Sequence, residues 1–281
     1  MKLSTEFNYG SILFGTEAAI RLMAEVGFEA LDYSMFDLNR EDNPLNHDGW
    51  QDRMASYRKI AEECGIGFNQ THATFPSFKE GDDDYNKANF PRLVRAIRAT
   101  AELGAPLVVM HPQPTGGNDF EKNVQFFSSL APYCRECGVK IAIENLIGTG
   151  CYCGNPEDLC ALIDALDSDC FTGLLDIGHA SINGVGAPAF IKAMGSRLSA
   201  LHVHDNDGVK DCHNMPYNRS LDWDAICAAL AENGYNGDFT YEAGFYARQF
   251  PKELVPDAYR MMVATGKYLV GKINAARVTN V

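Results

Sequence analysis

The sequence has no long apolar segment and few positive charges. Its first residues, 1–7, lack the hydrophobic stretch of a signal peptide, and no apolar run is long enough to span a bilayer. Lys and Arg number 24 against 37 Asp and Glu, which leaves a net charge of −13. These absences predict a cytoplasmic protein without a membrane span. They also argue against a nucleic-acid partner, because such a partner needs a basic surface.

Paired cysteine motifs are also scarce. The nine cysteines are scattered, odd in number and often inside predicted helices, which is typical of reduced thiols. Cys134 and Cys137 have the spacing of a redox or zinc pair, but no second pair follows them. We interpret these two, together with Cys151 and Cys153, as ordinary thiols.

The first predicted strand is not followed by a glycine-rich nucleotide-binding turn. What the chain does contain is a strict alternation of short apolar runs and amphipathic segments. The predicted strands are 3–7, 28–33, 66–72, 106–111, 139–144, 171–176, 198–204 and 239–242. The predicted helices include 16–26, 52–64, 82–103, 120–137 and 253–268. We expect Thr16 to cap the first of these helices and Gly27 to end it.

This alternation predicts an α/β fold. Strands joined by helical crossovers are parallel, and at this length the expected form is a single (β/α)8 TIM barrel over residues 1–281. A doubly wound open sheet is the alternative, which the missing glycine-rich turn disfavours.

Polar residues collect at the carboxyl ends of the predicted strands. His202 and His204 alternate at the seventh strand, so both point to one face, and Asp211 and His213 follow in an acidic turn. Six of the seven histidines lie at or just past a strand end, and only His47 lies elsewhere. One histidine alone is more often a hydrogen-bonded core residue than a ligand. In a barrel, however, these ends converge on one mouth, where active sites of this fold are built.

Four of the strand-end residues form a metal-ligand set. They offer three carboxylates and one imidazole without a thiolate, which suits Mn²⁺, Zn²⁺, Co²⁺ or Mg²⁺; they are Glu144, Asp176, His202 and Glu242. Without a cation these groups would repel one another or change protonation. A divalent ion here can bind two neighbouring sugar oxygens and stabilise an enediolate. Glu144 and Glu242, three strands apart, can then remove and return the carbon-bound proton from opposite sides.

The strand-end motifs, taken in order, resemble the xylose isomerase-like TIM-barrel superfamily over nearly the whole chain. These motifs are Thr71-His72-Ala73, Met110-His111-Pro112, Ile143-Glu144-Asn145, Asp176-Ile-Gly-His179, His202-Val-His-Asp205, Asp211-Cys-His213 and Tyr241-Glu242. The superfamily contains sugar and sugar-phosphate isomerases and epimerases, inosose-converting enzymes and endonuclease IV. The resemblance to the isomerases implies that Glu144, Asp176, His202 and Glu242 bind the metal and that the two glutamates transfer the proton. It also implies that His179 contacts substrate.

Endonuclease IV, which has a three-zinc cluster, is the alternative branch. The resemblance implies additional ligands, all present here, at His72, His111, His179, Asp211 and His213. In an isomerase these residues would line the pocket or hold further metal. Against a nuclease, segments 5–10 and 27–34 resemble the isomerase branch, and no strand-end loop is basic enough to grip DNA. A third alternative is a non-catalytic sugar-binding barrel, in which sugar binding would survive the loss of Glu144.

Substrate contacts are expected from His179, His111 and Arg219. Ketose 3-epimerases carry a substrate-binding arginine just after the seventh-strand motif, whereas residues 205–208 here contain none. Arg219 is a candidate for a phosphate or carboxylate of the substrate, with a plain surface role as the alternative.

Aromatic residues are expected either to wall the pocket or to pack in the core; they are Phe7, Trp50 and Phe75. The expected protein is thus a divalent-metal-dependent isomerase or epimerase of a sugar or polyol ketone. The resemblance further implies a homo-oligomer.

Overall fold

The computed structural model describes residues 1–148 and 150–279. Within these ranges the chain forms eight strands: β1 (Leu3–Glu6), β2 (Ala30–Ser34), β3 (Gly67–His72), β4 (Leu107–Met110), β5 (Lys140–Glu144), β6 (Phe171–Asp176), β7 (Leu198–His202) and β8 (Phe239–Tyr241). Each strand begins and ends within about two residues of the predicted run. The small differences are expected, because a hydrophobic pattern defines the ends of a strand less sharply than its middle.

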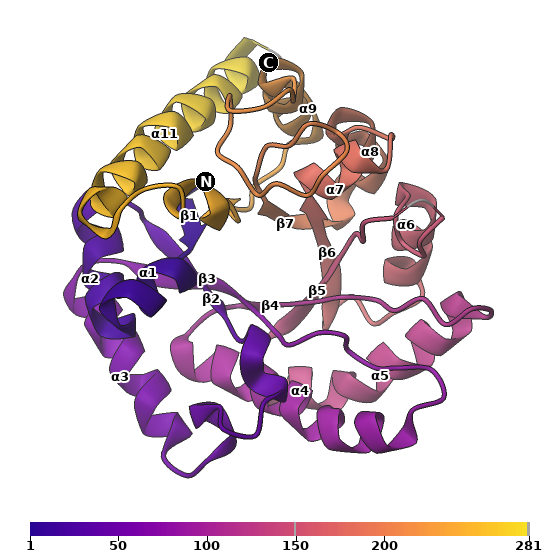
Figure 1. Cartoon of the computed structure of the whole chain (residues 1–281). Helices are drawn as coiled ribbons and strands as arrows, with labels where there is room; N and C mark the ends of the chain where they lie inside the picture. Colours follow the sequence, from indigo (N-terminus) through magenta and orange to yellow (C-terminus); the bar gives the residue numbers. More distant parts are fainter. Residues whose placement is uncertain (149, 280–281) are drawn as a thin grey trace.

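The strands follow one another around a nearly closed barrel. Neighbours pair in parallel from β1 to β7, and β8 pairs with β1 in the register Leu3 opposite Phe239. A parallel bridge between Val203, just past β7, and Tyr241 completes the ring. Figure 1 shows the strands at the centre with helices around them. The predicted (β/α)8 barrel is confirmed, and the open doubly wound sheet is excluded.

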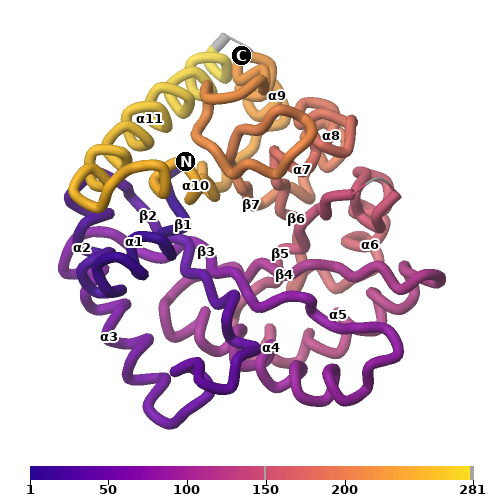
Figure 2. The backbone as a smooth tube through the Cα atoms, viewed as in Figure 1, coloured from indigo at the N-terminus to yellow at the C-terminus, as the bar shows by residue number. Residues whose placement is uncertain are grey.

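The helices lie outside the ring. They are α1 (Asn8–Phe14), α2 (Thr16–Val26), α3 (Trp50–Glu63), α4 (Asp83–Leu103), α5 (Asp119–Cys137), α6 (Pro156–Asp164), α7 (Ile177–Ile182), α8 (Ala187–Met194), α9 (Trp223–Asn233), α10 (Gly244–Ala247) and α11 (Val255–Thr279). Short 3₁₀ turns occur at Phe36–Asn39, Pro44–Asn46, Gly195–Arg197 and Lys252–Leu254. Figure 2 shows that α11 lies between α2 and α9, so the last helix closes the outer layer beside the start of the chain.

Local signals explain most helix ends. The Asp82 side chain accepts a hydrogen bond from the first turn of α4, and Gly27 ends α2 with a left-handed φ of 105°. The expected cap at Thr16 is wrong, because Gly15 occupies the cap position and Thr16 is already helical. The helix predicted to end at 268 continues to Thr279.

The packing inside the barrel shows which side chains at the strand ends point inward. Four small or branched side chains from neighbouring strands form a separate apolar layer; they are Val109, Ala142, Leu174 and Ala200. Side chains two residues apart on a strand share a face. The next inward positions are therefore those of His111, Glu144, Asp176 and His202, directly above this layer.

Two sequence-based expectations outside the barrel can also be compared with the structure. All nine cysteines lie in the described part of the chain and are free thiols, as predicted. Among the described helices, none combines the length and apolar character that crossing a bilayer requires.

Candidate active site

A cavity of about 480 Å³ opens at the carboxyl ends of the strands. Its carboxylate and imidazole lining comes from elements far apart in sequence, namely Glu6, His72, His111, Glu144, His179, Asp211, His213 and Glu242. Phe36, Phe75 and Phe245 add aromatic walls. A concave site with apolar walls and a few polar groups is typical of small-molecule binding.

Four residues at strand ends, which we call the strand group, meet beneath this cavity; they are Glu144, Asp176, His202 and Glu242. Each offers one ligand atom, and these atoms all lie within 4.8 Å of one another. Glu144, Asp176 and His202 are at most 1% exposed, so water screens them little. The structure thus brings together the four residues that the sequence predicted as metal ligands.

The ring of His202 is held in one orientation. Its Nδ1 lies 3.3 Å from Glu144 Oε1 and 3.2 Å from Glu242 Oε2, while Nε2 lies 3.2 Å from Asp32 Oδ2. Gln70 donates a hydrogen bond of 2.9 Å to the same Asp32 oxygen. A carboxylate that accepts from one imidazole nitrogen leaves the other free to bind a metal. Nδ1 is therefore the nitrogen that His202 presents to the strand group.

His72 and His111 approach the strand group at Glu144. Their Nε2 atoms lie 3.3 Å and 3.1 Å from Glu144 Oε2, and the two rings stand 3.2 Å apart at these nitrogens. His72 Nδ1 lies 2.7 Å from the carbonyl oxygen of Ala73, where it can donate. These three side chains make a second possible metal position that shares Glu144.

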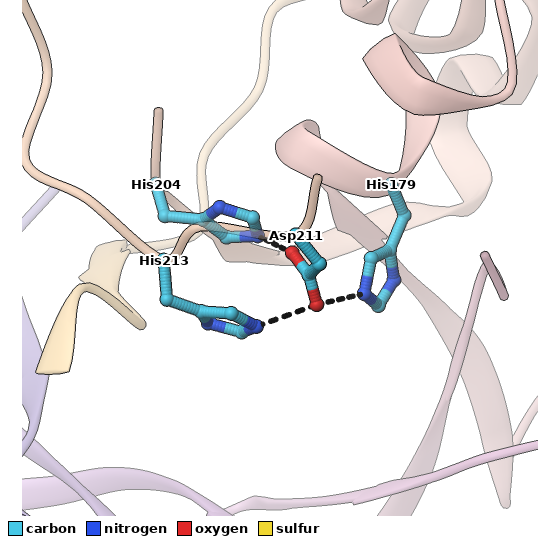
Figure 3. Close-up of side chains that lie close together, drawn as sticks. All are labelled: His179, His204, Asp211 and His213. Carbon is cyan, nitrogen blue, oxygen red and sulfur yellow. Dashed lines mark hydrogen bonds and ion pairs between the residues drawn. The ribbon is translucent and has the colours of Figure 1, made fainter. Parts of the chain in front are cut away.

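A further cluster, which we call the loop group, consists of His179, His204, Asp211 and His213 (Figure 3). Asp211 lies between the rings. Its Oδ2 is 2.8 Å from His213 Nε2 and 3.6 Å from His179 Nε2, and its Oδ1 is 3.6 Å from His204 Nε2. His204 Nε2 also lies 3.0 Å from both Asp176 oxygens, so the two groups are adjacent.

Backbone carbonyls orient two of the loop-group rings. His179 Nδ1 lies 2.9 Å from the carbonyl oxygen of Asn145, and His213 Nδ1 lies 2.8 Å from that of Glu242. With Nδ1 donating to these oxygens, both rings turn Nε2 toward Asp211. The arrangement has the donor geometry of a metal-binding histidine with a hydrogen-bonded partner behind it.

The loop from 203 to 222 carries three of the four loop-group residues and is held by Asp205. This buried carboxylate accepts hydrogen bonds from the amides of Arg219 and Leu221 and from Trp223 Nε1. Gly178 makes room for the neighbouring ring, because a Cβ atom at this position would lie 1.9 Å from Cε1 of His204. The glycine of the Asp176-Ile-Gly-His179 motif is therefore required by packing.

The charged side chains of the strand group shift one another's pKa values. Burial alone would raise the pKa of Glu144 and Asp176, but the nearby histidines outweigh it. The pKa of Glu144 lies well below its usual range, and that of Asp176 falls to about 2. Burial disfavours a charged His202, yet Glu242 and Glu144 raise its pKa well above the usual value.

In the loop group, too, neighbouring charges outweigh burial in setting the pKa values. Burial opposes protonation of His179 and His213, but Asp176 and Asp211 overcome it and raise both pKa values to about 10. Burial would raise the pKa of Asp211, but hydrogen bonds from these two histidines hold it well below its usual range. Protons on the histidines thus balance the carboxylates, and a cation can take their place.

The donor atoms suit a divalent cation. The buried Oδ1 of Asp211 has no hydrogen-bond partner among residues 1–148 and 150–279. An unpaired buried carboxylate oxygen is costly, and an ion nearby would satisfy it. Nitrogen and oxygen donors without a thiolate match the metals expected from the sequence.

Three residues of the site were missing from the predicted ligand set: Glu6, Asp32 and His204. Glu6 lines the cavity, and burial raises the pKa of its carboxyl to about 7. Glu6 ends β1, so the signal that revealed Glu144 was present for it too, whereas Asp32 lies in the middle of β2 and is not a strand-end residue. His204 was recognised at the end of the seventh strand but was not assigned a role.

Other predicted pocket residues are distributed differently. Phe75 lines the cavity, whereas Phe7 and Trp50 are buried in the main core. Arg219 is exposed, its guanidinium donates to the carbonyl of Asn218, and the described residues that line the cavity do not include it. Arg248, which the sequence did not single out, does line the cavity.

Known proteins resemble this chain in sequence and in structure. The profile of a family described as xylose isomerase-like TIM barrel matches residues 20–263. The uncharacterized protein y4fM of Sinorhizobium fredii is 30% identical over 216 residues, which cover 66% of this chain and 69% of that protein.

Two solved structures share the fold. A D-tagatose 3-epimerase-like protein has a TM-score of 0.74 at 20% identity, covering 97% of this chain and 100% of its own. A D-psicose 3-epimerase, solved in the presence of D-fructose, has a TM-score of 0.76 at 16% identity, covering 96% and 100%. At these identities the likeness concerns the fold alone.

Proposed function

Because the chain belongs to the xylose isomerase-like TIM barrel family, we propose that it is a divalent-metal-dependent isomerase or epimerase of a sugar or polyol ketone. The strand group carries this proposal, since two glutamates, an aspartate and a histidine converge within 4.8 Å beneath a cavity of small-molecule size. The names of the two similar structures, a D-tagatose 3-epimerase-like protein and a D-psicose 3-epimerase, support the same class of reaction.

The roles follow from position. Glu144 and Glu242 both line the cavity and come from separate strand ends, so we assign them as ligands and as the groups that remove and return the carbon-bound proton. Asp176 and His202, buried behind them, are ligands alone. When bound there, Mn²⁺, Zn²⁺, Co²⁺ or Mg²⁺ supplies positive charge beside the oxygens of the sugar and so favours loss of that proton. His111 and His179 face the cavity as substrate contacts.

The test is exchange of carbon-bound hydrogen in deuterated water. Metal-loaded protein is incubated with ketoses, inososes and their phosphates, and deuterium incorporation is followed by NMR. Glu144→Gln and Glu242→Gln should each slow exchange about 10²- to 10⁴-fold, the usual contribution of a general acid or base. Glu17→Gln, an exposed glutamate in α2, is the matched control.

Exchange at the parental rate in both glutamine variants would contradict the assigned roles. Sugar binding without any exchange, preserved in Glu144→Gln, would instead indicate a non-catalytic sugar-binding barrel. Metal content measured alongside by plasma mass spectrometry separates loss of the ion from loss of the proton-transfer group.

A second candidate function is an endonuclease IV-like zinc phosphodiesterase that acts on abasic DNA. The observation that favours it is the presence of further possible metal positions, among them one formed by His72, His111 and Glu144 and another formed by the loop group. About one ion per chain, unchanged in Asp211→Ala and His213→Ala, would support the isomerase. About three zinc ions, falling in either variant and accompanied by cleavage of abasic DNA, would support the phosphodiesterase.

Three further expectations remain proposals: one domain over 1–281, a cytoplasmic location and a homo-oligomer. Residues 149, 280 and 281 of that range lie outside the described part of the chain. The nine free thiols support a reducing compartment. Sedimentation of the purified chain measures the oligomeric state directly.

A further inference from the structure

Arg248 directly follows α10 and is the one lysine or arginine among the described residues that line the cavity. Its guanidinium carbon lies 5.0 Å from the ring centre of Phe245 and 5.4 Å from that of Tyr9. Contact with aromatic faces holds the planar guanidinium group and leaves its N–H donors available. The side chain is therefore oriented at the cavity without using up its hydrogen-bonding capacity.

Arg248 also lacks a carboxylate partner within residues 1–148 and 150–279, although the chain is strongly acidic. Seven other arginines of the described residues each pair with an Asp or Glu; Arg197 with Asp164 and Arg260 with Asp257 are two such pairs, each at 2.6 Å. Those pairs stabilise the surface. Arg248 leaves its charge available to a ligand.

The charge around the cavity is asymmetric. Four carboxylates line it, from Glu6, Glu144, Asp211 and Glu242; histidines contact three of them, whereas Arg248 forms no ion pair with any of the four. A ligand with one anionic end is attracted to the guanidinium, which favours one orientation in the cavity. Under the proposed function its carbonyl end lies at the strand group.

We propose that Arg248 binds an anionic group, a phosphate ester or a carboxylate, at the end of the sugar that is remote from the reacting carbonyl. The inference rests on the proposed function for the sugar part of the ligand. Two parallel N–H donors of the guanidinium match two oxygens of either group. Arg219, the residue that the sequence offered for this role, is exposed like Arg248, but it is not among the described residues that line the cavity, and its guanidinium donates to a backbone carbonyl.

The experiment compares matched ligands on the metal-loaded full chain. Fructose, fructose 6-phosphate and a keto sugar acid are titrated by calorimetry, and the turnover of each is measured as deuterium exchange. Arg248→Gln removes the charge, and Arg248→Lys keeps it but loses the bidentate geometry. Arg260→Gln, on the surface of α11, is the control for loss of an arginine elsewhere.

Arg248→Gln should weaken binding of the anionic sugars about 10- to 100-fold, the usual contribution of a charge-assisted hydrogen bond, and change fructose binding less than about threefold. Arg248→Lys should fall between the parent and Arg248→Gln. Added salt should weaken binding of the anionic sugars in the parent more than in Arg248→Gln. The two anionic probes show whether phosphate or carboxylate is preferred.

Equal loss for neutral and anionic sugars in Arg248→Gln, or no loss at all, would overturn the inference. The same loss in Arg219→Gln but not in Arg248→Gln would move the anion site to Arg219 and would also overturn it. Dependence on Arg248 for abasic DNA alone, without sugar binding, would count against it as well. Binding of anionic sugars that needs Arg248 but leads to no exchange would instead refute the proposed reaction while keeping the anion site.

Discussion

The strand group and the loop group hold similar donor atoms but are built in different ways. Glu144, Asp176 and His202 each end a strand and Glu242 follows one, so the backbone ladder of the barrel places them. The loop group takes His204, Asp211 and His213 from the segment between β7 and α9, where His213 adopts a left-handed φ of 38°. Such a φ is costly for a residue other than glycine and persists only when surrounding contacts impose it.

The comparison shows that two clusters with similar metal-binding donor atoms can depend on different parts of the molecule for their geometry. The strand group needs only the fold, with Asp32 to orient one ring. The loop group needs particular contacts at Asp205 and Gly178. Substitutions at these three positions should therefore act on one group and spare the other.

The largest effect is expected at Asp205. Asp205→Ala leaves two backbone amides and Trp223 Nε1 without their acceptor, which should lower the free energy of unfolding by about 3 kcal/mol. Metal binding at the loop group should weaken while exchange catalysed at the strand group persists. Urea unfolding and metal titration measure the two quantities.

The control for this change is Asp207→Ala in the same loop. Asp207 is exposed and accepts from the amides of Val209 and Lys210, so its loss should cost less than about 1 kcal/mol. Equal destabilisation by the two alanine variants would show that Asp205 has no special part in holding the loop.

The next largest effect is expected at Gly178. The added Cβ of Gly178→Ala overlaps the ring of His204, and overpacking of this kind typically costs about 2 kcal/mol. Thermal unfolding and metal titration at the loop group should both register the change. Gly271→Ala in α11 is the control, since a Cβ there meets no described atom within 4 Å and alanine favours a helix. Unchanged stability in Gly178→Ala would contradict the packing argument.

A smaller effect, confined to the strand group, is expected at Asp32. Asp32→Asn weakens the contact that orients His202, and loss of such a partner typically lowers metal affinity about tenfold, or about 1.4 kcal/mol. Competition with a chelator measures this affinity. Asp37→Asn, exposed in the turn after β2, should have no effect. An affinity loss at the loop group instead would break the distinction between the two groups.

The last effect is a pH slope in the metal-free protein. The pKa values of His179 and His213, about 10 when folded, lie above the ordinary value of 6.5. Their contribution to stability is therefore complete below pH 6.5 and is lost as the pH rises toward 10. Urea midpoints should fall across this window, and His213→Asn should flatten the slope by about 1 kcal/mol per pH unit or less. A slope that is the same in His213→Asn would exclude this histidine as its source.

Much of the strand group was predictable from particular residues. The alternation that places Ala142 and Glu144 on one face of β5 also places Leu174 with Asp176 and Ala200 with His202, so inward residues could be counted along the chain. The same count identifies Glu6 and Asp32 as inward-facing. They were missed because the predicted ligand set contains no residue from the first two strands. The cap at Thr16 was wrong because a glycine in an irregular turn took the position instead.

The loop residues were predictable only in part. Asp211 and His213 stood out in the acidic turn after the seventh strand, but their role as ligands came from the family resemblance, and nothing in their spacing indicates that Asp205 and Gly178 hold them in place. Arg219 and Arg248 cannot be ranked from the sequence, since both are arginines that follow a strand. Only the path of the chain brings Arg248 to the cavity.

The sequence by itself determined the barrel, the convergence of the histidines and the metal-binding donor set of the strand group. Strand periodicity and chain order place these inward side chains at one mouth of the barrel. The tertiary structure decided which nitrogen of His202 faces the site, how the loop-group side chains come together and which arginine lines the cavity. Those features depend on contacts between residues far apart in the chain, which local patterns of hydrophobicity do not encode.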